Sequence, residues 1–123
     1  MGSHRTQKAN PRLGVLRVPQ DWPPLPNNIG KKRMIPAIDG TKRHFRIEDE
    51  IIHPQSNSNR KIIVFQKMHF LEEDRVEFRF GYYMIGIKPK AKGRWVWGQF
   101  CLLLPEEDLM AILEKARKRK WFR

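Results

Sequence analysis

The clearest alternation of hydrophobic and polar residues lies between positions 75 and 87. Val76, Phe78 and Phe80 are separated by charged residues, as expected for a strand with one face in the core and one in water. After Gly81 the phase of the alternation shifts, so we predict a bulge or bend at that glycine. This segment is the most informative strand signal in the chain.

Weaker patterns predict further β-structure. The segment 35–47 holds two extended stretches on either side of Asp39-Gly40, a dipeptide typical of hairpin turns. Residues 61–71 are rich in β-branched and aromatic side chains, which favours a strand buried on at least one face. The segment 94–104 is expected to be a strand that returns alongside 75–87.

The last apolar pattern has the spacing of a helix. Four apolar residues recur along one helical stripe: Leu109, Ile112, Leu113 and Ala116. Pro105 suits the first helical position, acidic residues follow it, and basic residues gather towards Lys118, where the helix dipole favours them. We therefore predict one helix from Pro105 to about Lys118 that packs against the sheet.

Proline interrupts regular structure in the first part of the chain. Five prolines stand between positions 11 and 26, and proline removes backbone donors from helices and sheets. The first four residues are typical of a residual expression tag. We predict that residues 1–34 are this remnant followed by an irregular basic arm, with at most a short strand over 13–18. Trp22 and Leu25 are expected to pack on the main body.

The order of these elements predicts the fold class. Strands precede a single C-terminal helix, which indicates an α+β fold with a curved antiparallel sheet of about four to six strands packed by that helix. The length of 123 residues suits one compact domain, which we place at residues 35–123.

The charge of the chain points to a partner. The sequence holds 25 Lys and Arg against 13 Asp and Glu, a formal net charge of +12. Residues 1–44 carry nine basic and two acidic residues, residues 45–87 carry six and seven, and residues 88–123 carry ten and four. The excess therefore sits at the two ends. It is larger than solubility requires and predicts a polyanionic partner, usually nucleic acid, with acidic proteins and anionic lipids as alternatives.

Aromatic and basic residues gather around the predicted hairpin between 75–87 and 94–104. Single-stranded nucleic acid is bound by flat aromatic faces that stack on bases and by cations that follow the phosphates. The predicted nucleic-acid site comprises Arg79, Tyr83, Lys88, Lys90, Lys92, Arg94, Trp95 and Trp97. Secondary electrostatic contacts are predicted at Lys31, Lys32, Arg33, Arg117, Lys118 and Arg119. For the two tryptophans, the alternative is packing under the helix or under the N-terminal arm.

A local motif resembles a known family. The run from Lys88 to Gly93, the strand end Leu104-Pro105 and the short amphipathic helix resemble the C-terminal hairpin and helix of the positive-cofactor-four type of transcriptional coactivator. The resemblance covers about residues 79–116. It implies a homodimer that binds single-stranded DNA with a curved four-stranded sheet and one helix, and it places Arg79, Lys88, Lys90 and Lys92 on DNA.

Catalytic chemistry has weaker support in the sequence. A metal-dependent nuclease needs carboxylates that converge on a divalent ion, whereas the acidic runs 48–50 and 72–74 are predicted to form turns in which alternate side chains diverge. His44, His53 and His69 have no spacing that fixes them on one face, and Cys101 is the only cysteine. We expect no catalytic residue, metal or cofactor, and keep nuclease activity as a hypothesis to be tested.

A protein-interaction module of a larger assembly is the leading alternative function. The segment from Trp22 to Pro26 could adopt a polyproline helix that docks on another protein, or fold back on its own sheet. No apolar run approaches the roughly 20 residues that cross a bilayer, so no membrane partner is expected. The expected location is cytoplasmic.

Overall fold

The computed structural model describes residues 4–7 and 16–122, with side-chain surroundings from Val18 onward. Near the N-terminus, β1 (His4–Gln7) and β2 (Leu16–Pro19) form a two-stranded antiparallel sheet. The arm is therefore less irregular than the prolines predicted. Residues 16–18 of the strand predicted over 13–18 belong to β2, and its residues 13–15 lie outside the described residues, as do residues 1–3 of the tag remnant.

The main body is a five-stranded antiparallel sheet in the order β3-β4-β5-β6-β7. Its strands are β3 (Lys32–Pro36), β4 (Lys42–Pro54), β5 (Lys61–Phe70), β6 (Arg75–Ile85) and β7 (Trp95–Trp97). The predicted hairpin at Asp39-Gly40 is confirmed, and Gly40 has a positive φ of 87° that suits glycine in the turn. The α+β class and the strand count are those that the sequence predicts.

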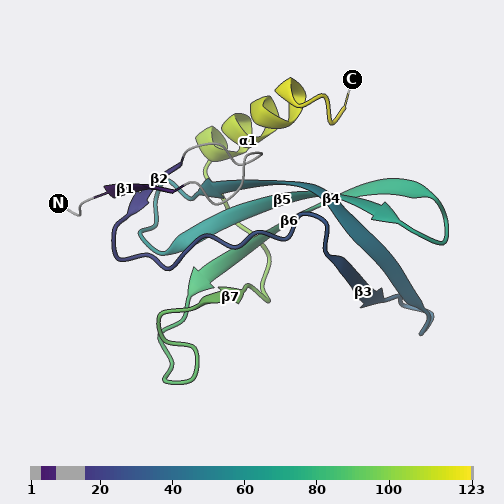
Figure 1. Ribbon diagram of the computed structural model, residues 1–123, viewed down its shortest axis with the longest axis horizontal. Helices are drawn as coiled ribbons and strands as arrows, with labels where there is room; N and C mark the ends of the chain where they lie inside the picture. The colour runs from purple at the N-terminus through teal and green to yellow at the C-terminus, as the bar shows by residue number, and fades with distance from the viewer. Residues whose placement is uncertain (1–3, 8–15, 123) are drawn as a thin grey trace.

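The sheet curls so that its two edge strands approach each other. Figure 1 shows β3 and β7 on the side of the sheet opposite α1 (Glu106–Lys118), so the sheet has a convex face under the helix and a concave face between its edges. The sheet has one register shift, on β4 between Ile47 and Asp49, where β4 contains one residue more than its partner β5. Such a bulge increases the local twist of the sheet.

The bulge that we predicted at Gly81 is wrong. The pairing of β5 with β6 runs without a shift from Lys61 opposite Met84 to Phe70 opposite Arg75. Gly81 is required for a different reason: a Cβ there would lie 2.3 Å from the ring of Trp97. The glycine therefore gives the tryptophan room to lie flat on the strand.

The helix covers the convex face. Ile112, Ala116 and Trp121 pack against Ile51, Ile63 and Phe65 of the sheet in one buried cluster. Glu106 to Asp108 fill the first turn and basic residues the last, as the sequence predicts, and Pro105 is the residue just before the helix. No helix in the described part of the chain is long and apolar enough to cross a membrane.

The arm covers part of the concave face. Trp22 and Leu25 are buried, and with Val18 they pack on Ile52, Ile62 and Val64. This confirms the predicted docking of the arm on the main body. The chain's own sheet thus covers the Trp22 and Leu25 side chains of the 22–26 segment. These two side chains are therefore not available to dock on another protein.

Two expectations about the later strands are corrected. The returning strand, predicted over 94–104, ends at Trp97, after which the chain passes to the convex face and brings Leu102 and Leu104 against the helix cluster. Val76, Phe78 and Phe80, predicted as core, lie on the convex face but remain 43%, 40% and 37% exposed, because the helix lies over the neighbouring strands and does not reach across β6.

Candidate nucleic-acid interface

A polar pocket lies in the middle of the concave face. Its cavity of about 260 Å³ is lined from all five strands and the end of the arm, by Asn28, Arg33, Ile47, Gln66, Arg79, Tyr83 and Trp97. We call this the concave pocket. Arg33 and Trp97 come from the opposite edge strands β3 and β7, which only the curl of the sheet can bring together. Of the predicted site residues, Arg33, Arg79, Tyr83 and Trp97 are thus gathered in one place.

A buried hydrogen-bond network forms the floor of the concave pocket. The Glu50 side chain is 0% exposed and accepts hydrogen bonds from the backbone N–H of Asn28 at 3.2 Å and its Nδ2 at 3.0 Å. Gln66 Nε2 donates to the same carboxylate at 2.5 Å. A charge in the interior is costly unless it is fully hydrogen-bonded, and these donors meet that requirement for Glu50.

Arg79 stands above this floor. Its Nε donates to Gln66 Oε1 at 2.8 Å, so Gln66 links the guanidinium to Glu50. The guanidinium Cζ lies 5.0 Å from the ring centroid of Trp97 and 5.2 Å from that of Phe45. Within the described part of the chain, the two terminal nitrogens of this guanidinium make no hydrogen bond to protein. They are the groups that an anion in the pocket would meet.

The charge balance of the concave pocket is positive. Burial lowers the pKa of Arg79. The charges of Tyr83 and Glu50 oppose that shift, and the neighbouring positive charge of Arg33 adds to it. Among the described residues, the lining holds two guanidinium groups and no carboxylate, and the carboxylate of Glu50 lies beneath the floor. Arg79 is half-buried and Arg33 is exposed, and a bound anion would relieve the repulsion between these like charges.

Aromatic rings form one wall of the concave pocket. Trp97 packs edge-to-face on Tyr83, with ring centroids 5.0 Å apart, and lies over Gly81. The Tyr83 hydroxyl accepts a hydrogen bond from Asn28 Nδ2 at 3.1 Å. Both rings are half-buried, so each retains exposed surface towards the cavity.

Trp95 has a different environment from Trp97. Its ring lies edge-to-face against Trp22 at 5.2 Å and 89°, and its Nε1 donates to the carbonyl of Pro24 at 3.0 Å. The arm therefore contacts the ring of Trp95, one of the two tryptophans that the sequence placed on the same surface. For Trp95 the alternative of packing under the arm is the one observed, so of the three predicted rings only Tyr83 and Trp97 line the concave pocket.

The basic loop between β6 and β7 is exposed as predicted. Lys88, Lys90, Lys92 and Arg94 all reach solvent, and none forms an ion pair within the described residues. Arg94 donates to the backbone carbonyl of Lys90, which closes the loop on itself. The loop leads directly into β7 and so places its cations at the rim of the same hairpin that carries Trp97.

The secondary contacts divide into two groups. Lys31 and Lys32 are exposed beside Arg33, but the strand alternation points Lys32 away from the concave face. Arg117 forms an ion pair with Glu114 at 2.6 Å, and Lys118 is exposed at the end of the helix on the convex side. Only Arg33 of this group lines the concave pocket.

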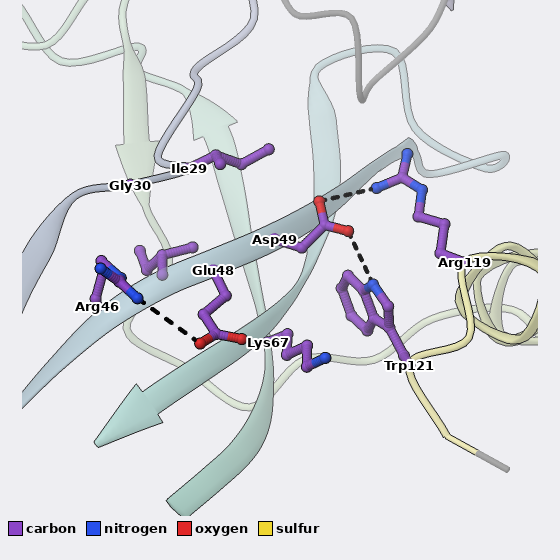
Figure 2. A pocket seen from close by; sticks show the side chains of 9 residues that line it. Ile29, Gly30, Arg46, Glu48, Asp49, Lys67, Arg119 and Trp121 are labelled. Atoms are coloured by element: carbon purple, nitrogen blue, oxygen red, sulfur yellow. Dashed lines mark hydrogen bonds and ion pairs between the residues drawn. The ribbon is translucent and has the colours of Figure 1, made fainter. Parts of the chain in front are cut away.

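A second pocket of about 580 Å³ lies where β4 meets the end of the helix. Figure 2 shows Arg119 and Trp121 reaching the two oxygens of Asp49, at 3.2 and 2.9 Å. Arg46 lies 3.9 Å from Glu48 across the same pocket. Both carboxylates of this pocket, Glu48 and Asp49, therefore pair with arginines, and Arg119 has a structural role in holding the helix end.

His44, His53 and His69 each contact a different carboxylate, and none of them lines either pocket. His44 contacts Glu72 at 2.8 Å, His69 contacts Asp74 at 2.7 Å, and His53 contacts Asp108 at 3.0 Å. Cys101 is exposed. Among the described residues, no group of three or more His, Cys, Asp or Glu side chains is placed to hold a metal ion.

The sequence reasoning missed the floor of the concave pocket. Gln66 was the available signal, because it interrupts the apolar run of 61–71 at a position that a strand buries. Asn28 and Glu50 gave no comparable signal, since one follows a proline-rich segment and the other belongs to an acidic run that is typical of a solvated turn.

Comparison of the chain with protein-family models, with curated proteins and with solved structures gives no match.

Proposed function

We propose that this protein binds nucleic acid without catalysing a reaction, and that it prefers single strands to duplexes. The observation that carries the proposal is the concave pocket, where two guanidinium groups without a carboxylate on the lining stand beside two partly exposed aromatic rings. Phosphate and nucleobase are the two chemistries that such a combination suits, because guanidinium binds phosphate in a bidentate manner and aromatic rings stack on bases.

The shape of the site favours single strands. A base reaches Trp97 and Tyr83 only by entering a cavity of about 260 Å³ between the edges of the sheet. Bases of a single strand can be unstacked and inserted in this way, whereas paired bases stay within the helix. A duplex would contact only the rim, through the loop of Lys88, Lys90, Lys92 and Arg94.

The loop supplies the electrostatic part of the binding. Its four cations have no ion pair in the described chain, so phosphates can replace the counterions around them. A strand that crosses this loop and enters the concave pocket would place phosphates between the loop and Arg33, with bases against Trp97. The local resemblance to single-stranded-DNA-binding coactivators, carried by the same loop, agrees with this path.

Fluorescence titration with labelled single-stranded and duplex oligonucleotides tests the proposal. Arg33→Gln should weaken single-strand binding roughly tenfold, because it removes one of the two guanidinium groups. The pair Lys90→Gln and Lys92→Gln should lower the slope of log affinity against log salt by roughly 0.7 per lysine. Lys42→Gln is the matched control, since it removes the same charge from an exposed position on the other face of the sheet.

Two results would overturn the proposal. Binding that is absent at low ionic strength, with unchanged tryptophan emission, would remove nucleic acid as the ligand. An equal loss of affinity in Arg33→Gln and Lys42→Gln would mean that net charge alone is responsible. Incubating the same oligonucleotides with magnesium or manganese tests the nuclease hypothesis, and intact oligonucleotides would remove it.

A second candidate function is the binding of another protein on the convex side. A groove of about 460 Å³ beside β7 is lined mainly by apolar side chains, among them Met84, Val96 and Phe100, and Phe100 is 85% exposed. Pull-down before and after nuclease treatment distinguishes the two functions, because a protein contact survives the nuclease and a contact through nucleic acid does not.

A further inference from the structure

The outer edge of β6 is largely uncovered. The neighbouring strand β7 pairs only with Tyr83, Met84 and Ile85, so no strand of the described chain pairs with the outer edge from Arg75 to Gly81. Figure 1 shows the first half of β6 extending beyond β7. Long open edges can pair with another chain, and proteins usually shorten, charge or cover them.

The backbone groups that face this edge can be identified from the hydrogen bonds further along β6. The Tyr82 carbonyl accepts from Gly98 N–H at 2.8 Å, on the β7 side, whereas Ile85 N–H donates to Arg60 on the β5 side. Because successive residues of a strand point their N–H and C=O groups to opposite sides, even-numbered residues face the outer edge. Val76, Phe78 and Phe80 therefore present free donors and acceptors.

The same three residues carry an apolar row. Their side chains lie on the convex face and are 43%, 40% and 37% exposed, as is Phe122 at 39%, whose ring lies 6.3 Å from that of Phe78. A contiguous apolar strip along an open strand edge is unusual for a surface that stays in water. The edge and the strip together indicate a surface that another β-strand covers.

We infer that the partner is a second copy of this chain, paired antiparallel through β6 about a two-fold axis at Phe78. In this register Phe78 meets its own copy, and Val76 meets Phe80 of the other copy. Each of these pairs exchanges two backbone hydrogen bonds, because all three residues face the edge. On the concave side, Glu77 of each copy lies opposite Arg79 of the other.

Charge selects this register from its neighbours. A pairing centred on Glu77 would place Glu77 against its own copy and Arg75 against Arg79, and one centred on Arg79 would place two guanidinium groups together. Like charges directly opposite each other are destabilising in antiparallel pairs. A pairing centred on Val76 would set Asp74 against Phe78 and leave Phe80 without a partner. A pairing centred on Phe80 would need the Tyr82 carbonyl, which already accepts from Gly98. Of these registers, the pairing centred on Phe78 alone satisfies the charges and the apolar row together.

The side chain of Glu77 has capacity for such a contact. Its hydrogen bonds to Arg43 and Arg75, both at 2.7 Å, use Oε2 alone, and Oε1 makes none within the described chain. The inference does not depend on nucleic-acid binding, since it rests on the open edge of β6, its apolar row and the charges of Glu77 and Arg79. It would join the sheets of two copies into one continuous sheet.

Sedimentation velocity of the full chain over a wide range of concentration is the test. The wild-type chain should form dimers that dissociate on dilution. Val76→Pro removes an N–H that faces the open edge and is otherwise tolerated on an edge strand, so it should give a monomer with an unchanged circular dichroism spectrum. Val76→Thr keeps the N–H and the branched side chain, and should still dimerise.

A mixing experiment tests the register. Glu77→Arg alone and Arg79→Glu alone each place like charges opposite each other, and should weaken self-association at least about tenfold. A mixture of the two variants places opposite charges in both pairs and should form a heterodimer. Heterodimer formation also shows that both variants are folded.

Three results would overturn the inference: a wild-type chain that stays monomeric at every concentration, a dimer that survives Val76→Pro, or variants that fail to combine when mixed. None of these results depends on oligonucleotide affinity. Failure of the dimer is therefore distinguishable from failure of the proposed function.

Discussion

The two faces of the curled sheet are built from different chemistry. On the convex face, Ile112, Ala116 and Trp121 of the C-terminal segment close an apolar core against the sheet, and the buried carboxylates Asp49 and Asp108 are hydrogen-bonded to neighbouring residues. On the concave face, the arm covers only one part. The rest keeps the fully buried carboxylate of Glu50 and a half-buried guanidinium, that of Arg79, whose terminal nitrogens have no partner in the described chain. Burying charge is rarely the most stable solution, because apolar residues of similar size would avoid the desolvation cost. This difference is why we look for function on the concave face.

The largest expected effect comes from removing the anchor of the arm. Trp22 is 3% exposed, packs on Trp95 and donates its Nε1–H to the carbonyl of Asn59 at 2.6 Å. Trp22→Ala should lower the free energy of unfolding by about 3–5 kcal/mol, as large aromatic truncations in cores do. Denaturant titration measures it, with the exposed neighbour Asp21→Ala as the control, for which a change below about 0.5 kcal/mol is expected. A loss below about 1 kcal/mol in Trp22→Ala would place the arm outside the core.

A smaller effect is expected at the start of the helix on the convex side. Asp108 accepts hydrogen bonds from Ser56 N–H at 2.9 Å and Ser56 Oγ at 3.1 Å, and contacts His53 Nε2 at 3.0 Å. Asp108→Asn should cost about 1–3 kcal/mol, because the amide presents a donor where the carboxylate accepted. Thermal unfolding at neutral pH measures the loss, and Glu106→Gln, exposed in the same turn, is the matched control.

The contribution of Asp108 should also depend on pH. Burial by itself raises the pKa of this carboxyl, but the hydrogen bonds from Ser56 and His53 outweigh it and hold the pKa below the ordinary value of 3.8. A carboxyl whose pKa is lowered in the folded state stabilises the protein above its unfolded-state pKa, and that stabilisation is lost as pH falls through the lower folded value. The stability difference between wild type and Asp108→Asn should therefore shrink below about pH 4. A constant difference would contradict this assignment.

Two glycine substitutions, one on each face of the sheet, test which face binds oligonucleotides. A Cβ at Gly81 would lie 2.3 Å from the Trp97 ring, and one at Gly98 would lie 2.0 Å from the Tyr82 ring. Each Gly→Ala change should cost about 1–2 kcal/mol, because a packed ring must move. Gly81→Ala displaces a ring of the concave pocket and should also weaken oligonucleotide binding, whereas Gly98→Ala disturbs the convex side and should not. Equal binding losses would argue against the concave pocket as the site.

Much of the architecture could be predicted from local patterns. The hairpin at Asp39-Gly40 and the helix over 106–118 follow from turn chemistry, capping and spacing, which are properties of neighbouring residues. The phase shift predicted at Gly81 failed because Tyr83 and Ile85 pack under the arm while Tyr82 and Met84 line the convex groove. Where both faces of a strand are covered, apolar residues occupy successive positions and the apolar–polar alternation disappears. In the sequence this loss looks the same as the shift of phase that a bulge produces.

The candidate site was predictable only in part. Arg79, Tyr83 and Trp97 were identified because a basic and aromatic hairpin is visible in the sequence. Trp95, two residues from Trp97, was assigned to the same surface. Strand alternation shows that the two rings share a face, but it does not show which other residues cover each ring. The arm makes that distinction, by packing Trp22 on one ring and leaving the other beside the cavity.

The sequence by itself determined the α+β class, the order of the elements, and the placement of positive charge at the two ends around a nearly neutral β-rich middle. These depend on spacing, turn residues and composition, which are local. The tertiary structure decided which charges meet. The curl of the sheet brings Arg33 and Arg79 together over Glu50 from three different strands, and this cluster of two guanidinium groups and one carboxylate has a net positive charge.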